Sequence, residues 1–284
     1  NYLRKLGRLN QYLKEINLIK NKYNVDVIGD LISIFDKEIA LAMDNSKTKN
    51  RDPDTYVIIG TKSKSQSEKK FSDILKKLAR KNSVSVGKLT FNYRIDNELS
   101  HPVYRLPLKN ITGKVFGELF NLNKETYYTF IENYVVFGSS VKSLSKFIHN
   151  NVLKRTIITN DAYKEYKYNI SPRSSLSFYV NLGRSSANYA KFLTDEVFKG
   201  WEENIQVFQN VQVFGLQCNT SNNLIYNNVF LKYIPGISYT PHTVWESRLD
   251  TIIDFKPQFV KNHYTNQSDI FVQDLKNNIY LINN

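Results

Sequence analysis

The chain has only one cysteine, Cys218, among its 284 residues. A single thiol excludes an internal disulfide framework and any zinc site built from cysteines. No stretch approaches eighteen unbroken apolar residues, so the sequence predicts no membrane-spanning helix. The repeats of fibrous proteins are also missing. Because 41% of the residues are apolar, the chain can build a sizeable core, and we expect a globular protein.

Motifs for nucleotide binding and catalysis are missing as well. None of the eleven glycines fits G-x-x-x-x-G-K-S/T or G-x-G-x-x-G, and G-x-S-x-G is absent. The acidic loop with Asp44, Asp52 and Asp54 lacks the glycine and glutamate of a calcium-binding loop. The histidines are far apart and without metal-ligand spacing: His101, His149, His242 and His263. The sequence therefore predicts no catalytic residue, no metal and no cofactor.

Positive charge is in excess, with a net charge of +13 and an isoelectric point near 9.5. Such an excess is found in proteins that bind nucleic acid, anionic membranes or acidic partners. Here lysine dominates and arginine is scarce, whereas specific nucleic-acid readers use arginine forks. Abundant lysine, asparagine, isoleucine and tyrosine are typical of an AT-rich genome. We interpret the excess as compositional and do not expect nucleic acid as the main partner.

The most basic block lies between Lys62 and Lys88. The spacing of Phe71, Ile74, Leu75 and Leu78 predicts an amphipathic helix over residues 65–81. Six basic side chains fall on the opposite side of that helix: Lys69, Lys70, Lys76, Lys77, Arg80 and Lys81. Two hypotheses remain open: a merely solvated face, or a face for a polyanion or partner whose binding salt would weaken steeply.

One pattern occurs three times, a strand followed by a small-residue turn and a helix. It reads YVIIGTKSKS from Tyr56, YVVFGSSVKS from Tyr134 and YVNLGRSSAN from Tyr179. We expect Gly60, Gly138 and Gly183 to allow the turns. Side chains that follow them can cap the helices by accepting hydrogen bonds from free backbone amides, the candidates being Thr61, Ser139 or Ser140, and Ser185 or Ser186.

Further patterns predict an antiparallel fold. TYYTFI, the turn EN and YVVFG form a hairpin, and QVFQNVQVFGLQC pairs with NLIYNNVFLKY across NTSN. A helical stripe opens the chain and is expected to cover the domain's own sheet: Tyr2, Leu6, Leu9, Leu13 and Ile16. Residues 1–234 are predicted to form an α+β domain, an antiparallel sheet with helices packed on one face.

The composition changes near Tyr233. The segment IPGISYTPHT has prolines on both sides of a glycine and is typical of a linker. Residues 235–284 are predicted to hold this linker and the first strands of a propeller-like β-repeat region. The run DIFVQDLKNNIYLINN forms its hairpin, with a turn near Lys276 to Asn278.

A resemblance rests on three runs: TYYTFIENYVVFGSSVKSLSKFIHNN, SSLSFYVNLGRS and NVQVFGLQCNTSNNLIYNNVFLKY. They resemble an uncharacterised cell-envelope family of Bacteroidota, in which an α+β domain of unknown function precedes a quinoprotein-like or WD-like β-propeller. The resemblance implies a periplasmic or outer-membrane-associated protein, often a lipoprotein, held by an anchor outside this chain. It supplies no active-site residues.

Two functions are weighed from these observations. The preferred hypothesis is a non-enzymatic envelope protein that acts as a scaffold for other envelope proteins, in an outer-membrane assembly or secretion complex. The alternative is a nucleic-acid or polyanion-binding protein that uses the lysine-rich helical face. An enzyme acting on envelope glycans would need two paired carboxylates. The sequence offers no such pair.

Overall fold

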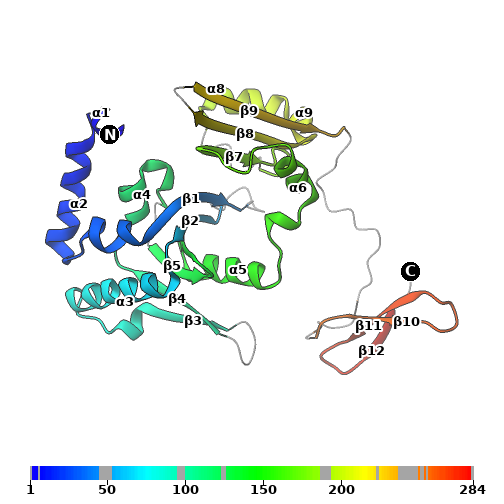
Figure 1. The fold of residues 1–284 in the computed structure, drawn as a ribbon. Coiled ribbons are helices and arrows are strands. Elements are labelled where there is room, and N and C mark those ends of the chain that lie inside the picture. Colours follow the sequence, from blue (N-terminus) through cyan, green and yellow to red (C-terminus); the bar gives the residue numbers. More distant parts are fainter. Residues whose placement is uncertain are drawn as a thin grey trace. The chain divides into compact units, whose positions relative to one another are not determined.

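The computed structural model divides the chain into one unit from Asn1 to Ile237 and another from Ser238 to Asn284. It is a mixed structure of helices and antiparallel sheets (Figure 1). The residues that the structure describes are 2–5, 7–44, 53–94, 100–122, 126–185, 193–221, 224–235, 249, 253 and 255–282. The predicted linker lies mostly outside them.

The first unit contains a six-stranded sheet in the order β1-β2-β6-β5-β4-β3, in which every neighbouring pair is antiparallel. The predicted hairpin is confirmed, because Ile131 pairs with Tyr134 across a two-residue turn that opens with Glu132 at a φ of 50°. The strands are β1 (Phe35–Met43), β2 (Thr55–Thr61), β3 (Thr90–Arg94), β4 (Ser100–Leu106), β5 (Thr126–Ile131) and β6 (Tyr134–Gly138).

Helices cover both faces of this sheet, so the prediction of helices on one face only was wrong. Strands β2 and β6 bury successive side chains on alternate sides, which gives each face its own apolar cluster. Helix α3 (Lys64–Lys81) packs Phe71, Ile74 and Leu78 on one face. Helix α5 (Val141–Val152) packs Leu144 and Ile148 on the other. Strands that are apolar on both sides need a cover on both sides.

The N-terminal helix also differs from the prediction. Gly7, at a φ of 68°, separates α1 (Tyr2–Lys5) from α2 (Leu9–Tyr23). In α2 the buried residues are Ile16 and Ile19, and Leu13 from the predicted stripe is exposed. A π-helix, η1 (Val27–Leu31), and a 3-10 helix, η2 (Ile32–Ile34), then lead into β1.

Two of the three repeated turns are described in full. Ser140 caps α5 as predicted, since its Oγ accepts the Ser143 N–H at 3.1 Å. Helix α3 is capped by Ser63 instead of Thr61, whose hydroxyl donates to the Asn133 carbonyl. Neither Gly60 nor Gly138 has a positive φ. A Cβ at position 138 would lie 3.0 Å from the Leu144 side chain, so close packing explains this glycine.

The third turn leads out of β7 (Leu176–Val180). Residues 186–192, including Ser186, lie outside the described part. Gly183 and Ser185 lie in a turn in which Asn181 Oδ1 accepts the Arg184 N–H at 3.0 Å. Whether Ser185 or Ser186 caps a helix stays a prediction.

A second sheet of the first unit has the order β7-β8-β9. Strand β8 (Val211–Ser221) pairs antiparallel with β7 and with β9 (Leu224–Tyr233), as the sequence predicted for the last two. Among the described residues, the remaining helices of the unit are η3 (Val86–Leu89), α4 (Ile111–Phe116), η4 (Glu118–Phe120), η5 (Ile157–Thr159), α6 (Asp161–Tyr168), α8 (Asp195–Glu203) and α9 (Ile205–Gln209).

The second unit contains a three-stranded antiparallel sheet in sequence order: β10 (Gln258–Lys261), β11 (Ser268–Gln273) and β12 (Ile279–Ile282). The predicted hairpin between β11 and β12 is confirmed, and Asn277 has the left-handed φ of 64°. Asp274 holds this turn, because its carboxylate accepts the backbone N–H groups of Lys276 and Asn278.

Candidate functional site

The predicted basic face lies on α3. Asp30, in η1, is placed between two of its lysines, with Oδ2 3.2 Å from Lys77 Nζ and Oδ1 3.6 Å from Lys70 Nζ. The Asp30 side chain is only 18% exposed, so this carboxylate is better shielded than an ordinary surface acid. Two of the six basic groups are therefore partly neutralised and tie α3 to η1.

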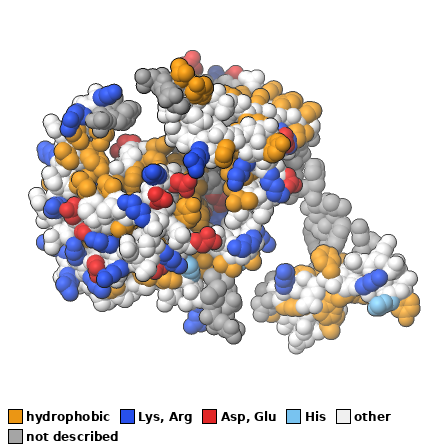
Figure 2. Space-filling view, in the orientation of Figure 1, with side chains coloured by type: hydrophobic (Ala, Val, Ile, Leu, Met, Phe, Trp, Pro, Cys, Tyr) orange, Lys and Arg blue, Asp and Glu red, His pale blue; other side chains and the backbone are white. Residues whose placement is uncertain are grey.

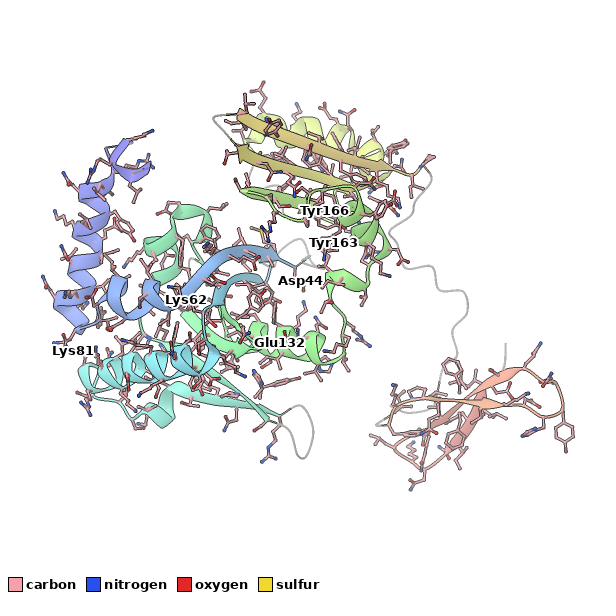
Figure 3. All side chains as sticks on the ribbon, in the orientation of Figure 1. Asp44, Lys62, Lys81, Glu132, Tyr163 and Tyr166 are labelled. Atoms are coloured by element: carbon pink, nitrogen blue, oxygen red, sulfur yellow. The ribbon has the colours of Figure 1, made fainter. Side chains whose placement is uncertain are left out.

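The other four basic side chains differ in their partners. Lys76 lies 3.7 Å from Asp73, one turn away. Within the described part of the chain, no ion pair involves Lys69, Arg80 or Lys81. Figure 2 shows blue and red side chains interspersed around α3, and Figure 3 labels Lys81 at the end of that helix. An open depression of about 350 Å³ lies beside Asp30 and the basic side chains. The structure thus brings four of the six together there: Lys70, Lys76, Lys77 and Arg80.

A second hollow, of about 500 Å³, opens between α3 and strands β4 and β5. Lys69 and His101 line it, together with Tyr104 and Tyr128, whose rings stack at 5.0 Å. His101 Nε2 lies 2.8 Å from the Phe130 carbonyl and forms a backbone contact. The hollow lacks a nucleophile paired with a base.

Asp44 and Asp54 of the acidic segment bind a lysine of α5, a contact that the sequence did not predict. Lys146, on α5, bonds to the Asp44 carboxylate and lies 3.5 Å from Asp54 Oδ2. The hydrogen bond that Lys146 donates to the Asp44 carboxylate raises the pKa of Lys146. Burial and then the charges of the two aspartates raise the pKa of the neighbouring Tyr56, whose hydroxyl donates to the Ser143 carbonyl at 3.0 Å. These contacts fix α5 to the sheet.

One side of the β7–β9 sheet is closed by aromatic residues of α6. Figure 3 labels Tyr163 and Tyr166, both from this helix. Tyr166 is 2% exposed, packs 5.8 Å from the Phe230 ring, and lies 3.0 Å from Ser177 through its hydroxyl. Gly215 leaves room for this ring, since a Cβ there would lie 2.1 Å from Tyr166 Cε2.

The other side of the same sheet is apolar and exposed. Gly215 and Phe230 face α6, so the residues that alternate with them along β8 and β9 point to the opposite side of the sheet. On that side Ile225, Val229 and Leu231 of β9 are exposed by 69%, 66% and 60%. Figure 2 shows hydrophobic side chains gathered over β8 and β9. We call this surface the β9 face, with five exposed members: Leu176, Phe178, Ile225, Val229 and Leu231.

Strand β9 also forms an edge of its sheet. Among the described residues it pairs only with β8, over ten residues, so its outer backbone groups have no partner strand. Its single charged residue is Lys232, which bonds to Glu165 of α6. Soluble proteins usually protect such edges with free charges, prolines or bulges. The outer side of β9 has no free charge.

No metal centre or membrane span is found in the part of the chain that the structure describes. Its His, Cys, Asp and Glu side chains form no group of three or more suited to a metal ion. None of its helices is long and apolar enough to cross a membrane. The only cysteine, Cys218, is half-buried on the β9-face side of β8.

These features define a protein of mixed helices and antiparallel sheets with an exposed apolar sheet face. The family described as "Protein of unknown function (DUF3352)" matches residues 4–231. The chain therefore belongs to that family, and the match includes the six-stranded sheet and all of the second sheet except the last two residues of β9. No curated protein and no solved structure matches the chain.

Sequence reasoning missed the β9 face. The run NLIYNNVFLKY predicted a strand that pairs with QVFQNVQVFGLQC, but no exposed face was predicted from it. A signal was present, because apolar residues occur at both odd and even positions of this strand and only one side can face α6. A strand that is apolar on both sides needs two covers or a partner.

Proposed function

We propose that this chain is a non-enzymatic interaction subunit that binds protein through the β9 face. The exposure of Ile225, Val229 and Leu231 is the observation that carries the proposal. Exposed contiguous apolar patches of several hundred Å² mark interaction sites on soluble proteins. An edge strand beside such a patch adds backbone hydrogen-bonding groups for a partner strand.

The cellular setting in this proposal comes from the resemblance to envelope proteins of Bacteroidota. We place the chain in the periplasm or at the outer membrane, with other envelope proteins as its partners in an assembly or secretion complex. We also propose that β10, β11 and β12 are the first strands of a β-propeller. Their antiparallel sequence order is compatible with a propeller blade.

The test is isolation of the tagged full-length protein from its own cells in mild detergent, at low and high salt. The face variant is Ile225→Ser with Val229→Ser. The control is Leu18→Ser on α2, where the leucine is similarly exposed at 59%. We expect proteins that stay bound to the wild type and the control at high salt and are lost from the face variant. The same proteins on all three would contradict the proposal.

Polyanion binding through α3 is the second candidate. It is favoured by the three basic side chains that have no acidic partner among the described residues: Lys69, Arg80 and Lys81. Its salt dependence differs from that of protein binding through the β9 face. The logarithm of the affinity for a polyanion falls linearly with the logarithm of the salt concentration, whereas apolar contacts persist at high salt. Nucleic acid that is recovered at low salt and lost at high salt would favour this candidate.

A further inference from the structure

We infer that the partner of the β9 edge is a second copy of this chain, with the two β9 strands paired antiparallel around a twofold axis. The inference rests on the proposed function and names the partner at that surface. The resulting sheet would have six strands, β7-β8-β9 from each copy.

The outer edge of β9 has the features of a strand that pairs with another. Every second residue of an antiparallel strand directs its N–H and C=O groups to the same side, so about five residues of β9 offer both groups outward. Lys232 is the only charge on the strand, and its bond to Glu165 turns it toward α6. A long apolar edge without a free charge is the kind that pairs with another strand.

Strand β9 can also pair with β9 of a second copy in a register that brings apolar side chains together. When a twofold axis perpendicular to the sheet relates two antiparallel strands, directly opposite residues point to the same side of the sheet. Side chains alternate along each strand, so the two residue numbers of a pair are both odd or both even, and their sum is even. With Asn228 on the axis, Ile225 lies opposite Leu231 of the second copy, and Tyr226 lies opposite its Phe230. Apolar side chains thus meet apolar ones in these two pairs, one on each side of the sheet, and Asn228 meets its own amide. In the other two pairs Val229 lies opposite Asn227 and Leu224 lies opposite Lys232.

The apolar area of the β9 face also fits an interaction surface. The five exposed side chains of the β9 face present roughly 500 Å², which equals the largest patch on a typical monomer. Pairing of the two edges buries the outer backbone and the flanking side chains of a ten-residue strand on each copy and leaves both β9 faces at the surface. Two joined faces also form one continuous apolar surface.

The charge of the chain predicts how the pairing responds to salt. Two copies with a net charge of +13 each repel one another at low ionic strength. Salt screens this repulsion and leaves backbone hydrogen bonds and apolar contacts intact. Self-association through β9 therefore strengthens as salt is added, whereas binding of a polyanion weakens.

The experiment measures the mass of the purified chain by sedimentation between micromolar and several hundred micromolar, at low and high salt. We expect a monomer-to-dimer transition that moves to lower concentration at high salt. Leu231→Lys abolishes it, and Leu18→Lys leaves it unchanged, since the two leucines are exposed by 60% and 59%. A chain that stays monomeric at all concentrations, or two variants with equal effects, would overturn the inference.

Cysteine cross-linking tests the register in a Cys218→Ser background. Asn228→Cys lies beside its own copy on the axis and forms a disulfide-linked dimer under mild oxidation. Tyr226→Cys lies about 14 Å from its own copy and stays monomeric. Equal cross-linking of both variants would contradict the pairing. A monomeric chain that still binds another protein through the β9 face would overturn the second copy as partner and leave the proposed function standing.

Discussion

At the scale of single residues, Gly215 and Tyr166 depend on each other. Any side chain at position 215 meets the Tyr166 ring, because the two would approach to 2.1 Å. We expect Gly215→Ala to lower the free energy of unfolding by about 1–3 kcal/mol through overpacking. Gly200→Ala in α8 is the control, since a Cβ there has nothing within 4 Å. The control should be stabilising by about 1 kcal/mol, because alanine is the better helix former. Urea unfolding measures both, and equal effects would contradict the account.

A second prediction at this scale concerns Asp274. Burial would raise the pKa of this carboxyl, but hydrogen bonds from Asn278, Tyr280 and Lys276 outweigh it and hold the pKa below its ordinary value. Because the pKa of Asp274 is lower in the folded chain than in the unfolded chain, the ionised carboxylate stabilises the fold. This stabilisation is complete when the pH is above the pKa of the unfolded chain, near 3.9, and is lost as the pH falls through the pKa of the folded chain.

We therefore expect the β11–β12 turn to keep its structure at pH 5 and to lose it in acid below the ordinary carboxyl range. The amide NMR signals of Lys276 and Asn278 should move together in an acid titration. In Asp274→Asn the group no longer titrates, so the same signals should move much less. An identical titration of the variant would show that another acid controls the turn.

At the scale of elements, the start of α5 separates two serines that the sequence left equivalent. Ser140 accepts the Ser143 N–H, and its carbonyl accepts the Ser143 hydroxyl at 2.9 Å. Ser140→Ala should cost about 1 kcal/mol of unfolding free energy, the usual effect of losing an N-cap. Ser139→Ala should change it by less than about 0.5 kcal/mol. Thermal unfolding of the pair measures the difference, and the reverse order would place the cap at Ser139.

The α3 face gives another element-scale prediction. Asp30→Asn releases Lys70 and Lys77 from their shared carboxylate. We expect this variant to need a higher salt concentration for elution from a heparin column than the wild type. Asp36→Asn, at an exposed position of β1, removes the same charge away from α3 and is the control. Equal shifts in both variants would mean that heparin responds to net charge and not to this face.

Elements were more predictable than their arrangement. The stripe of Phe71, Ile74, Leu75 and Leu78 predicted α3, because a period of 3.6 is visible in the sequence. The coverage of both sheet faces was missed, since the spatial strand order β2-β6-β5 joins segments far apart in the chain. The pairing of Asp30 with α3 was missed for the same reason.

The basic face of α3 shows how much of the candidate site could be predicted from the sequence. Helical periodicity placed its six basic residues on the exposed side of α3, and the structure puts them there. Their partners came from η1, which no local pattern connects to α3. The β9 face could have been suspected from its two-sided apolar pattern, but its exposure depends on which side α6 covers.

At the scale of the whole molecule, one basic chain carries two surfaces for which we expect opposite salt responses. If the α3 face binds a polyanion, as the second candidate function proposes, the net charge of +13 strengthens that attraction at low salt. The binding that we propose for the β9 face uses backbone and apolar contacts, which salt does not weaken. The salt dependence of any complex therefore identifies the surface that forms it.

The central claim is that the β9 face is the interaction surface. Hydrogen–deuterium exchange of the full chain, compared between dilute and concentrated solutions at high salt, tests it most directly because each segment reports separately. The account predicts that peptides covering Leu224–Tyr233 gain protection with concentration, while peptides from α3 and β12 do not change. Protection that appears at α3 or β12, or at no segment at all, would contradict it.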